Sequence, residues 1–350
     1  MTTISKTITK DDIIVSGARS TGVIHIGNYF GAIRNFAKMI EDFENPSFFF
    51  IADWHALTTH QNAELLKDSV RTTLATYLGC GLDPNKSTIY LQSDVPAISE
   101  LYLYLNMFAH LGELERTATF KEKIAANPNN INAGLLTYPV LMAADVLIHK
   151  GTKVPVGKDQ AQHIEMIRTF SNRLNRIYNK EIFKEALAYS YNDDFVTVPS
   201  LNGSGKMSKS DDPNSAILLL DSDKEIEKKI KKAKTDLGPT EKNSPLTPEV
   251  QNLFNLMALF SEEECITFFR NSYADCSIRY GDLKNQLAQD AIKFIRPIRE
   301  QIEVYLDKPN LLAEIAKSGA EKANESANKT IEELRDTLGL TRKFLNTISK

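Results

Sequence analysis

The chain has 350 residues, of which 42% are hydrophobic and 25% charged, and its formal net charge is −3, so any RNA would be bound by local patches rather than by the overall field. These values are typical of a soluble globular protein of two domains, with no apolar run as long as the ~18 residues of a membrane span and no apolar signal peptide. Three widely spaced cysteines without a C-x-x-C pair argue against a disulfide framework or a zinc knuckle and favour a reducing cytoplasm.

The first half of the chain alternates predicted strands with predicted helices. In chain order these are strand 13–16, helix 29–43, strand 46–57, helix 62–79, strand 87–94 and helix 98–111. The unbroken apolar run in the second strand is typical of a strand covered on both faces. The alternation predicts an α/β fold with a doubly wound, Rossmann-like parallel sheet.

The second half of the chain is predicted to be mostly helical. After "KVPVG" at 153–157 and a helix near 159–176, strand signals become rare, and from residue 223 onward nearly everything has helical character. The Pro- and Thr-rich stretch 236–249 interrupts this part. We therefore expect an α/β domain over residues 1–218 and a smaller all-helical domain over residues 219–350.

A glycine-containing loop follows the first predicted strand. Gly17, Gly22 and Gly27 lie in it, and His25 and Asn28 stand at the mouth of the next helix. Glycines at such a joint let the backbone approach phosphate, yet the spacing matches neither the dinucleotide nor the P-loop fingerprint. Alone, "HIGN" is a weak signal, because a histidine after a strand is usually structural.

A second cluster, "KMSKS", covers residues 206–210. A Lys/Ser/Asp/Gly cluster is most often a polar surface turn. Together with "HIGN", however, it would lie at the carboxyl ends of strands, where doubly wound sheets bind ligands.

These two motifs resemble the signatures of the class I aminoacyl-tRNA synthetases. The blocks between them are similar to those of the bacterial tryptophanyl-tRNA synthetase family: "ADWHALT" (52–58), "GELERTATFKEK" (112–123), "GLLTYPVLMAADVL" (134–147) and "VPVGKDQAQHIEMIR" (154–168). The resemblance runs from about residue 12 to the end of the chain. It implies a tryptophan–tRNA ligase that uses ATP and Mg²⁺, forms tryptophanyl-adenylate, acts as a cytoplasmic homodimer and charges tRNA(Trp).

The resemblance also implies an ATP site. Lys206 and Lys209 would close over the triphosphate, since an ammonium is a compact charge on a flexible stem. Met207 would lie near the adenine, Ser208 and Ser210 would donate to phosphate, and Lys121 would also reach the phosphates unless it is a solvated helix lysine. The remaining implied ATP contacts are Ala18, Arg19, Ser20, Gly27, Asn28, Gly157, Lys158 and Asp159.

For the amino acid, spacing and resemblance point to the same helix. Tyr138, Met142 and Asp145 lie at i, i+4 and i+7, so they share one helix face, which by itself favours a core stripe with a paired carboxylate. Within the matching block, Asp145 is implied to accept the indole N–H, which can only donate. The other residues implied to bind tryptophan are Val15, Gly17, His55, Tyr138, Met142, Val154, Val156 and Gln160; His55 could equally end its strand.

Two departures from the family pattern concern this site. Arg19 and Ser20 replace the usual Gln-Pro, so an arginine could meet phosphate directly. Val15 occupies a position where many relatives carry an aromatic residue, which would loosen one wall of the pocket.

Contacts with tRNA are less specified by the sequence. Residues 224–234 carry six lysines and two glutamates and fit either a solvated amphipathic helix or a tRNA-backbone contact. The resemblance implies that the C-terminal helices read the anticodon. Three alternatives stay open: a tyrosine-specific relative, a small nucleotidyltransferase, and a non-catalytic paralogue that binds RNA or tryptophan.

Overall fold

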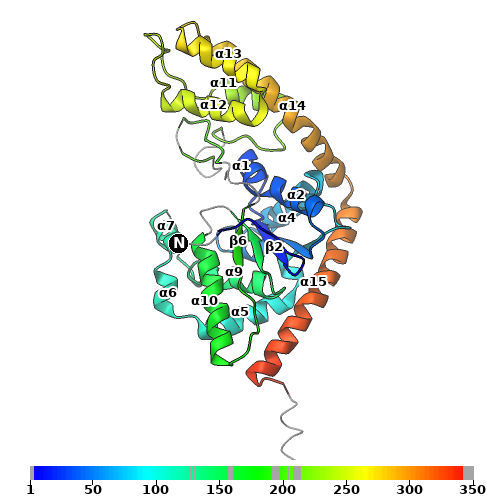
Figure 1. The fold of residues 1–350 in the computed structure, drawn as a ribbon. Coiled ribbons are helices and arrows are strands. Elements are labelled where there is room, and N and C mark those ends of the chain that lie inside the picture. Colours follow the sequence, from blue (N-terminus) through cyan, green and yellow to red (C-terminus); the bar gives the residue numbers. More distant parts are fainter. Residues whose placement is uncertain are drawn as a thin grey trace, which may run out of the picture.

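Six parallel strands form one sheet in the part of the chain that the structure describes, in the spatial order β1–β6–β5–β2–β3–β4 (Figure 1). This computed structural model describes residues 4–126, 128, 131–156, 161–190, 197–203, 205–207 and 214–341. The strands are β1 (Ile4–Ser5), β2 (Ile14–Arg19), β3 (Ser47–Ala52), β4 (Thr88–Leu91), β5 (Lys153–Pro155) and β6 (Leu187–Tyr189). From β2 the chain builds outward to both sides, which confirms the predicted doubly wound fold.

Helices cover both faces of this sheet. They are α1 (Ile26–Asn28), the π-helix η1 (Tyr29–Ile33), α2 (Arg34–Asp42), α3 (Asp53–Leu57), α4 (Ala63–Gly79), the 3₁₀-helix η2 (Gln92–Asp94), α5 (Pro96–Phe108), α6 (Leu111–Glu115), α7 (Ala118–Ala126), α8 (Ala133–Leu136), α9 (Tyr138–Leu147), α10 (Ala161–Ile177), α11 (Asp223–Lys231), α12 (Pro248–Phe260), α13 (Glu263–Ala274), α14 (Tyr280–Leu306) and α15 (Pro309–Leu338). In β3, Phe49 and Ile51 belong to the core with α2 and α4, and Phe48 and Phe50 to the core with α5 and α9. Burial on both faces of β3 explains why its sequence is an unbroken apolar run, as predicted.

The predicted strand over 46–57 is too long. β3 ends at Ala52, and residues Asp53–Leu57 form α3. The carboxylate of Asp53 accepts the backbone N–H of Trp54 at 2.9 Å and that of Ser93 at 3.1 Å, and such local side-chain bonds favour a helix start over a continuing strand. The predicted strand 87–94 likewise ends at Leu91, while the edge strands β1 and β6 are too short to produce a sequence pattern.

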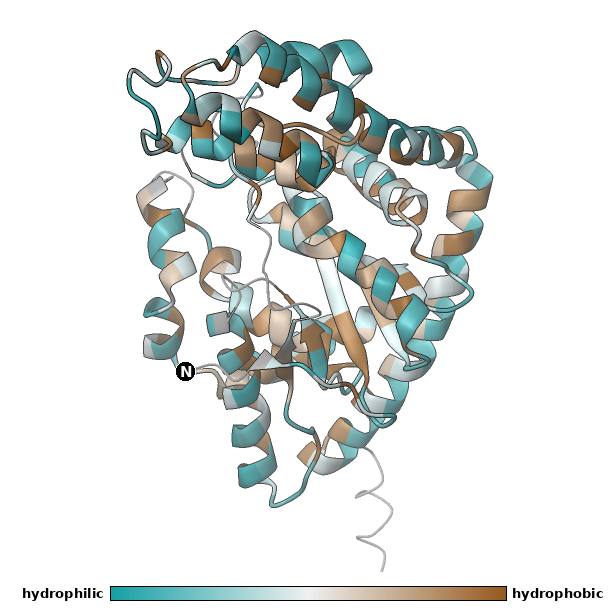
Figure 2. Ribbon diagram, turned by 45° about the horizontal axis from the view of Figure 1, so that its top comes forward, coloured by the Kyte–Doolittle hydropathy of each residue, from teal (hydrophilic) through white to brown (hydrophobic). Residues whose placement is uncertain are grey.

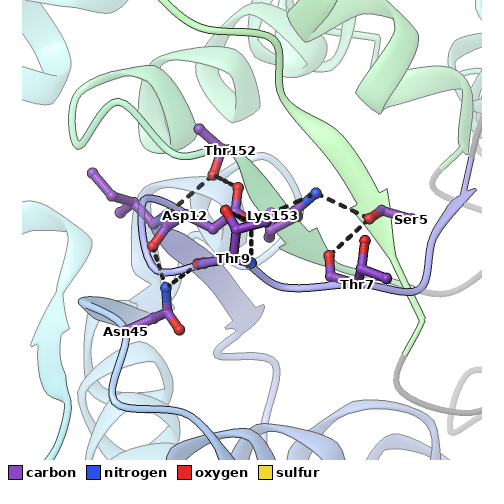
Figure 3. A network of polar contacts seen from close by, with 8 residues as sticks. Ser5, Thr7, Thr9, Asp12, Asn45, Thr152 and Lys153 are labelled. Carbon is purple, nitrogen blue, oxygen red and sulfur yellow. Dashed lines mark hydrogen bonds and ion pairs between the residues drawn. The ribbon is translucent and has the colours of Figure 1, made fainter.

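A partly buried polar network connects residues at one edge of the sheet, near the amino ends of β2 and β5 (Figure 3). Asp12 accepts the Thr152 hydroxyl at 2.7 Å and the Thr9 backbone N–H at 2.8 Å, and Lys153 donates to the Ser5 hydroxyl at 2.9 Å. Burial raises the pKa of Asp12, but these hydrogen bonds and the nearby Lys153 ammonium outweigh it, so the pKa lies below its usual value. The network ties β1, β2 and β5 together.

The C-terminal helices separate into two parts. Helices α11, α12 and α13 gather at one end of the molecule, and α14 leads from them to α15, which runs back along the sheet (Figure 1). Asn324 of α15 donates to the backbone oxygen of Asp94 at 2.8 Å. The division between residues 218 and 219 stays a prediction. Helix α15, which falls in the predicted helical domain, shares a core with β3, β4 and α5.

The helices carry one apolar and one polar side. Figure 2 shows hydrophobic and hydrophilic residues alternating along the helices, as expected for helices with one buried face. Among the described helices, none is both long enough and apolar enough to pass through a membrane.

Candidate active site

The "HIGN" segment begins α1 and is held by residues from much later in the chain. His25 caps α1 and accepts the Asn28 backbone N–H at 3.3 Å. The backbone N–H of Ile26 donates to Ile217, and that of Leu219 donates to Ile24. A side chain at Gly27 would lie 2.8 Å from the His25 ring, so only glycine fits there.

The lysine-rich segment meets this first motif. Met207 is 2% exposed, its backbone N–H donates to Val198 at 2.9 Å, and its Cβ lies 3.6 Å from the position of a Cβ at Gly27. Lys206 beside it is exposed. The structure thus anchors the segment at Met207 and brings the two sequence motifs together, whereas Ser208, Lys209 and Ser210 lie outside the described residues.

The carboxyl end of β2 carries Arg19. Its Nη2 donates to the Thr59 hydroxyl at 2.7 Å, and its buried Nε has no hydrogen-bond partner among the described residues. The buried Ser20 hydroxyl likewise has none in that part of the chain. Two unsatisfied polar groups at the end of a central strand are typical of a place where a ligand belongs.

Other residues of β2 pack inside the sheet. Val15 is fully buried, and a Cβ at Gly17 would lie 2.6 Å from the Phe50 backbone oxygen. Ala18 is half-buried. Gly17 therefore allows β2 to lie close to the backbone of β3, and Val15 is part of the core behind the site.

Asp145 of α9 is the centre of a buried polar cluster. It is fully buried; its Oδ2 lies 2.8 Å from His55 Nε2, and its Oδ1 accepts the Gln92 side-chain amide at 2.6 Å. Burial raises the pKa of Asp145, while the hydrogen bonds from His55 and Gln92 oppose that shift. The cluster joins the carboxyl ends of β3 and β4 to α9.

Aromatic rings cover this cluster. The His55 and Tyr138 ring centroids lie 4.3 Å apart, and those of Tyr138 and His163 lie 5.6 Å apart. Tyr138 and Met142 are half-buried one turn apart on the same helix as Asp145. The helix face thus carries one carboxylate next to apolar and aromatic groups.

Helix α7 presents a different lysine from the one predicted. Lys121 is exposed, whereas the Lys123 ammonium lies 4.5 Å from the Tyr138 ring centroid. Burial, together with the nearby Arg19 charge, lowers the pKa of Lys123 to about 8. Lys123 therefore lies between the Arg19 region and the Asp145 cluster.

Of the predicted residues between 154 and 160, only two are described. Val154 is buried and Val156 is half-buried beside Pro155, whose backbone oxygen accepts the Ser16 hydroxyl at 2.9 Å. Gly157, Lys158, Asp159 and Gln160 lie outside the described residues. Asn28, the remaining predicted ATP contact, is exposed at the end of α1.

Sequence reasoning missed Gln92 and Lys123. The predicted strand 87–94 includes Gln92, whereas β4 ends at Leu91 and Gln92 follows it directly. A polar residue near the carboxyl end of a parallel strand is the signal that could have indicated it. Lys123 had no such signal, because only the fold decides which lysine of "FKEK" turns inward.

A pocket of about 330 Å³ lies beside the cluster. It is lined mainly by apolar groups from α3, α5, α8 and α9, and its walls include Trp54, Leu57, Tyr102, Thr137 and Leu141. The Tyr102 and Thr137 hydroxyls lie 2.7 Å apart in its wall. Within the described residues, no group of three His, Cys, Asp or Glu side chains is arranged to hold a metal ion.

Comparisons with known proteins agree with one another. A family model described as class I tRNA synthetases (W and Y) matches residues 7–296. Tryptophan–tRNA ligases of Porphyromonas gingivalis and Rickettsia bellii are 53% and 40% identical, covering 94% and 93% of this chain and 99% and 98% of theirs. The tryptophanyl-tRNA synthetase of Campylobacter jejuni, solved with ADP and tryptophan, is 35% identical, with a TM-score of 0.82 over 93% of this chain and 99% of that one.

Proposed function

The chain belongs to the class I tRNA synthetases for tryptophan and tyrosine and has the function of a tryptophan–tRNA ligase, and we propose that the Asp145 cluster is its tryptophan site. The observation that carries the proposal is a single buried carboxylate on an otherwise apolar and aromatic helix face. Indole has one N–H, which can only donate, so a buried acceptor is the group that recognises it.

Such a site discriminates by hydrogen bonding. A ligand without the N–H would leave the Asp145 carboxylate underbonded in a water-poor pocket, and comparable sites reject such ligands by ~10⁴–10⁵-fold. Val154 and Val156 are proposed to line the indole ring, with Val15 behind them. Tyr138 and Gln160 are proposed to hold the α-ammonium group.

The reaction has two steps. A carboxylate oxygen of tryptophan attacks the α-phosphorus of ATP, the bond from that phosphorus to the bridging oxygen breaks, and pyrophosphate leaves with those electrons. The 3′-terminal hydroxyl of tRNA(Trp) then attacks the carbonyl carbon of the adenylate, loses its proton, and AMP leaves. The first step needs positioning and neutralisation of phosphate charge more than a general base.

The ATP side is proposed to lie where "HIGN" meets the lysine segment. Gly17, Gly27 and Asn28 would let the backbone approach the nucleotide, and Ala18, Arg19 and Ser20 would face its phosphates. Support comes from the unsatisfied Arg19 Nε and Ser20 hydroxyl and from the ADP-bound relative. Lys206 and Lys209 would stabilise the leaving pyrophosphate, with Lys121 or, on the observed geometry, Lys123 assisting.

The remaining proposed ATP contacts are Gly157, Lys158, Asp159, Met207, Ser208 and Ser210, as the family resemblance implies. The same resemblance implies Mg²⁺. Among the described residues, no three His, Cys, Asp or Glu side chains are grouped so that they could bind a metal ion.

We propose that α11 contacts the tRNA backbone. Ile226 and Ile230 are buried, whereas Lys224, Lys228 and Lys232 are exposed along the other side of the helix. Changing these three lysines to glutamine should raise the KM for tRNA(Trp) and reduce its salt dependence, without affecting adenylate formation. Equal salt dependence in parent and variant would leave α11 a solvated helix.

The proposed homodimer would form beside the apolar pocket. Leu103 and Met107 of α5 and Leu111 of α6 are 52%, 69% and 59% exposed, on elements next to the pocket walls. Exposed apolar side chains of this size on neighbouring helices are typical of association surfaces. Sedimentation equilibrium of Met107→Lys should show a shift toward monomer. We also propose that the protein works in the cytoplasm.

The test of the function is amino-acid-dependent exchange of pyrophosphate into ATP. Tryptophan should support exchange and tyrosine should not. Exchange with tyrosine alone would indicate the tyrosine-specific relative. Tryptophan binding without exchange would indicate a non-catalytic paralogue.

A further inference from the structure

We propose that Gln92 is a positioning residue for tryptophan recognition, whose side-chain amide holds the Asp145 carboxylate in place as a hydrogen-bond acceptor. The inference rests on the proposed role of Asp145 and extends it to a residue that does not itself touch the substrate. The supporting observation is that the buried Gln92 side chain, at the junction of β4 and η2, is hydrogen-bonded both to Trp54 and to Asp145.

The position of Gln92 is fixed on both sides. The side chain is fully buried, its Oε1 accepts the Trp54 backbone N–H at 3.1 Å, and its Nε2 donates to Asp145 Oδ1 at 2.6 Å. One amide thus bridges the start of α3 and the last turn of α9. Trp54 is the residue before His55, the second partner of Asp145.

The orientation of the amide follows from its neighbours. A backbone N–H can only donate, so the oxygen of Gln92 must face Trp54, and its NH₂ group must face Asp145. An NH₂ group in turn can only donate, so Oδ1 of Asp145 must accept. Gln92 therefore favours the form of Asp145 whose Oδ1 carries no proton.

This arrangement leaves room for a ligand. A carboxylate offers about four acceptor positions, and Gln92 and His55 use two of them. With those two donors holding both oxygens, the carboxylate cannot rotate away from the incoming indole N–H. The entropic cost of orienting the acceptor has been met in the folded protein before the ligand binds.

The charged and titratable groups around Asp145 determine how its pKa responds when Gln92 is replaced. Besides His55, Asp53 of α3 and Tyr90 of β4 interact electrostatically with Asp145. His149, just after the end of α9, bonds Tyr90 and is neutral because burial lowers its pKa to about 3. Burial already raises the pKa of Asp145, so loss of the Gln92 donor raises it further.

The experiment compares Gln92→Met with the parent. kcat/KM for tryptophan in pyrophosphate exchange should fall ~10–100-fold, as for the loss of a hydrogen bond to a buried charge. The acidic limb of its pH profile should move to higher pH, because the ionised form of Asp145 makes the stronger, charge-assisted hydrogen bond to the indole N–H. The KM for ATP should stay close to that of the parent.

A matched control lies in α14. Gln286 donates to Asp290 at 2.9 Å, so Gln286→Met removes the same kind of bond far from the cluster. Its pH profile should follow that of the parent. Gln92→Glu supplies a second signature, because the introduced carboxyl group and Asp145 can share one proton at low pH, but both ionise as the pH rises. Tryptophan kcat/KM should then gain a new alkaline limb.

A direct measurement separates this inference from the proposed function. The carboxyl carbon of Asp145 is followed against pH in protein labelled with ¹³C-aspartate and assigned with Asp145→Asn. A raised pKa in Gln92→Met shows that Gln92 holds the Asp145 carboxylate, and it supports the positioning role together with a lowered tryptophan preference in Asp145→Asn. A raised pKa beside an unchanged preference in Asp145→Asn would overturn the proposed function of the cluster while leaving the Gln92–Asp145 bond in place. An unshifted pKa and a parental pH profile in both Gln92 variants would overturn the role.

Discussion

His55 and Asp145 lie 90 positions apart in the chain, and their side chains meet at 2.8 Å, from Nε2 to Oδ2, with both residues buried. The second ring nitrogen of His55, Nδ1, is buried and has no hydrogen-bond partner in the part of the chain that the structure describes. When Asp145 is ionised, it accepts a hydrogen bond from Nε2–H of His55, and in the neutral imidazole Nδ1 is then an acceptor. The cluster is therefore rich in acceptors and suited to a ligand that donates.

The first prediction concerns Asp145→Asn. The fold should survive, because an amide oxygen can accept from Gln92 while the NH₂ group donates to the other tautomer of His55. The charge is lost, however, and charge-assisted hydrogen bonds are roughly twice as strong as neutral ones. The ratio of kcat/KM for tryptophan to that for phenylalanine should fall ~10–100-fold in pyrophosphate exchange.

Asp12→Asn is the matched control, because it changes a buried, hydrogen-bonded carboxylate at the opposite ends of the strands. That variant should lose stability and keep the parental ratio. ATP binding without amino acid should be unchanged in Asp145→Asn. If the ratio is unchanged, Asp145 is a structural carboxylate and another group recognises tryptophan.

The second prediction concerns the lysine segment. Lys206→Ala and Lys209→Ala should each lower the rate of adenylate formation ~10²-fold or more, since each would remove a charge that stabilises the leaving pyrophosphate. Tryptophan binding without ATP should hardly change. Lys184→Ala, at another exposed lysine, serves as the control in single-turnover measurements. Near-parental rates in both loop variants would contradict the phosphate role.

The third prediction concerns Arg19, the departure from the family pattern. Arg19→Gln should keep most of the activity, because glutamine is the usual residue, whereas Arg19→Glu should raise the KM for ATP by placing a negative charge near phosphate. Thr59→Val removes the hydroxyl that Arg19 contacts but keeps the positive charge, so it should have a smaller effect. ATP kinetics that do not change in the glutamate variant would mean that Arg19 points away from the nucleotide.

Features that depend on residues close together in the sequence could be predicted, and features that depend on distant residues could not. The strand through Phe48 and Phe50 was predictable because burial on both faces leaves a local apolar run. The shared face of Tyr138 and Asp145 was predictable because helical spacing is also local. Gln92 was not, because its role depends on contacts with residues far away in the sequence, which only the folded sheet brings together.

The fourth prediction concerns pH and the attachment of α15. Arg335 donates to both carboxylate oxygens of Glu100, and this bond lowers the pKa of Glu100 although burial opposes it. The bond therefore stabilises the fold above the ordinary pKa of a glutamate and is lost as the pH falls through the lowered value. Arg335→Met should lower the free energy of unfolding by ~0.5–1 kcal/mol near neutral pH, with the difference from the parent shrinking in acid.

Urea unfolding measured from neutral pH down to acidic pH, below the ordinary pKa of a glutamate, checks the fourth prediction. Lys329→Met is the control, since Lys329 and Glu325 form an exposed pair within α15. It should show a smaller change at every pH. A difference between Arg335→Met and the parent that does not vary with pH would mean that Arg335 stabilises α15 through packing alone.

The last prediction concerns the close approach of α15 to β4. A Cβ at Gly319 would lie 1.7 Å from the backbone oxygen of Ile89, and backbone lies on both sides of this contact. Neither side can yield by a rotamer change, so Gly319→Ala must push α15 away from the strand. The free energy of unfolding should fall by ~1–3 kcal/mol or more, the range for overpacked cores.

Gly281→Ala provides the comparison, because Gly281 lies in α14 with open space around the position of its Cβ. That substitution should be neutral or stabilise the protein by up to ~1 kcal/mol, through the better helix propensity of alanine. Because α15 also covers β4, from whose end Gln92 reaches Asp145, Gly319→Ala should raise the KM for tryptophan as well. Equal stability of the two alanine variants would show that α15 does not pack against β4 at this distance in solution.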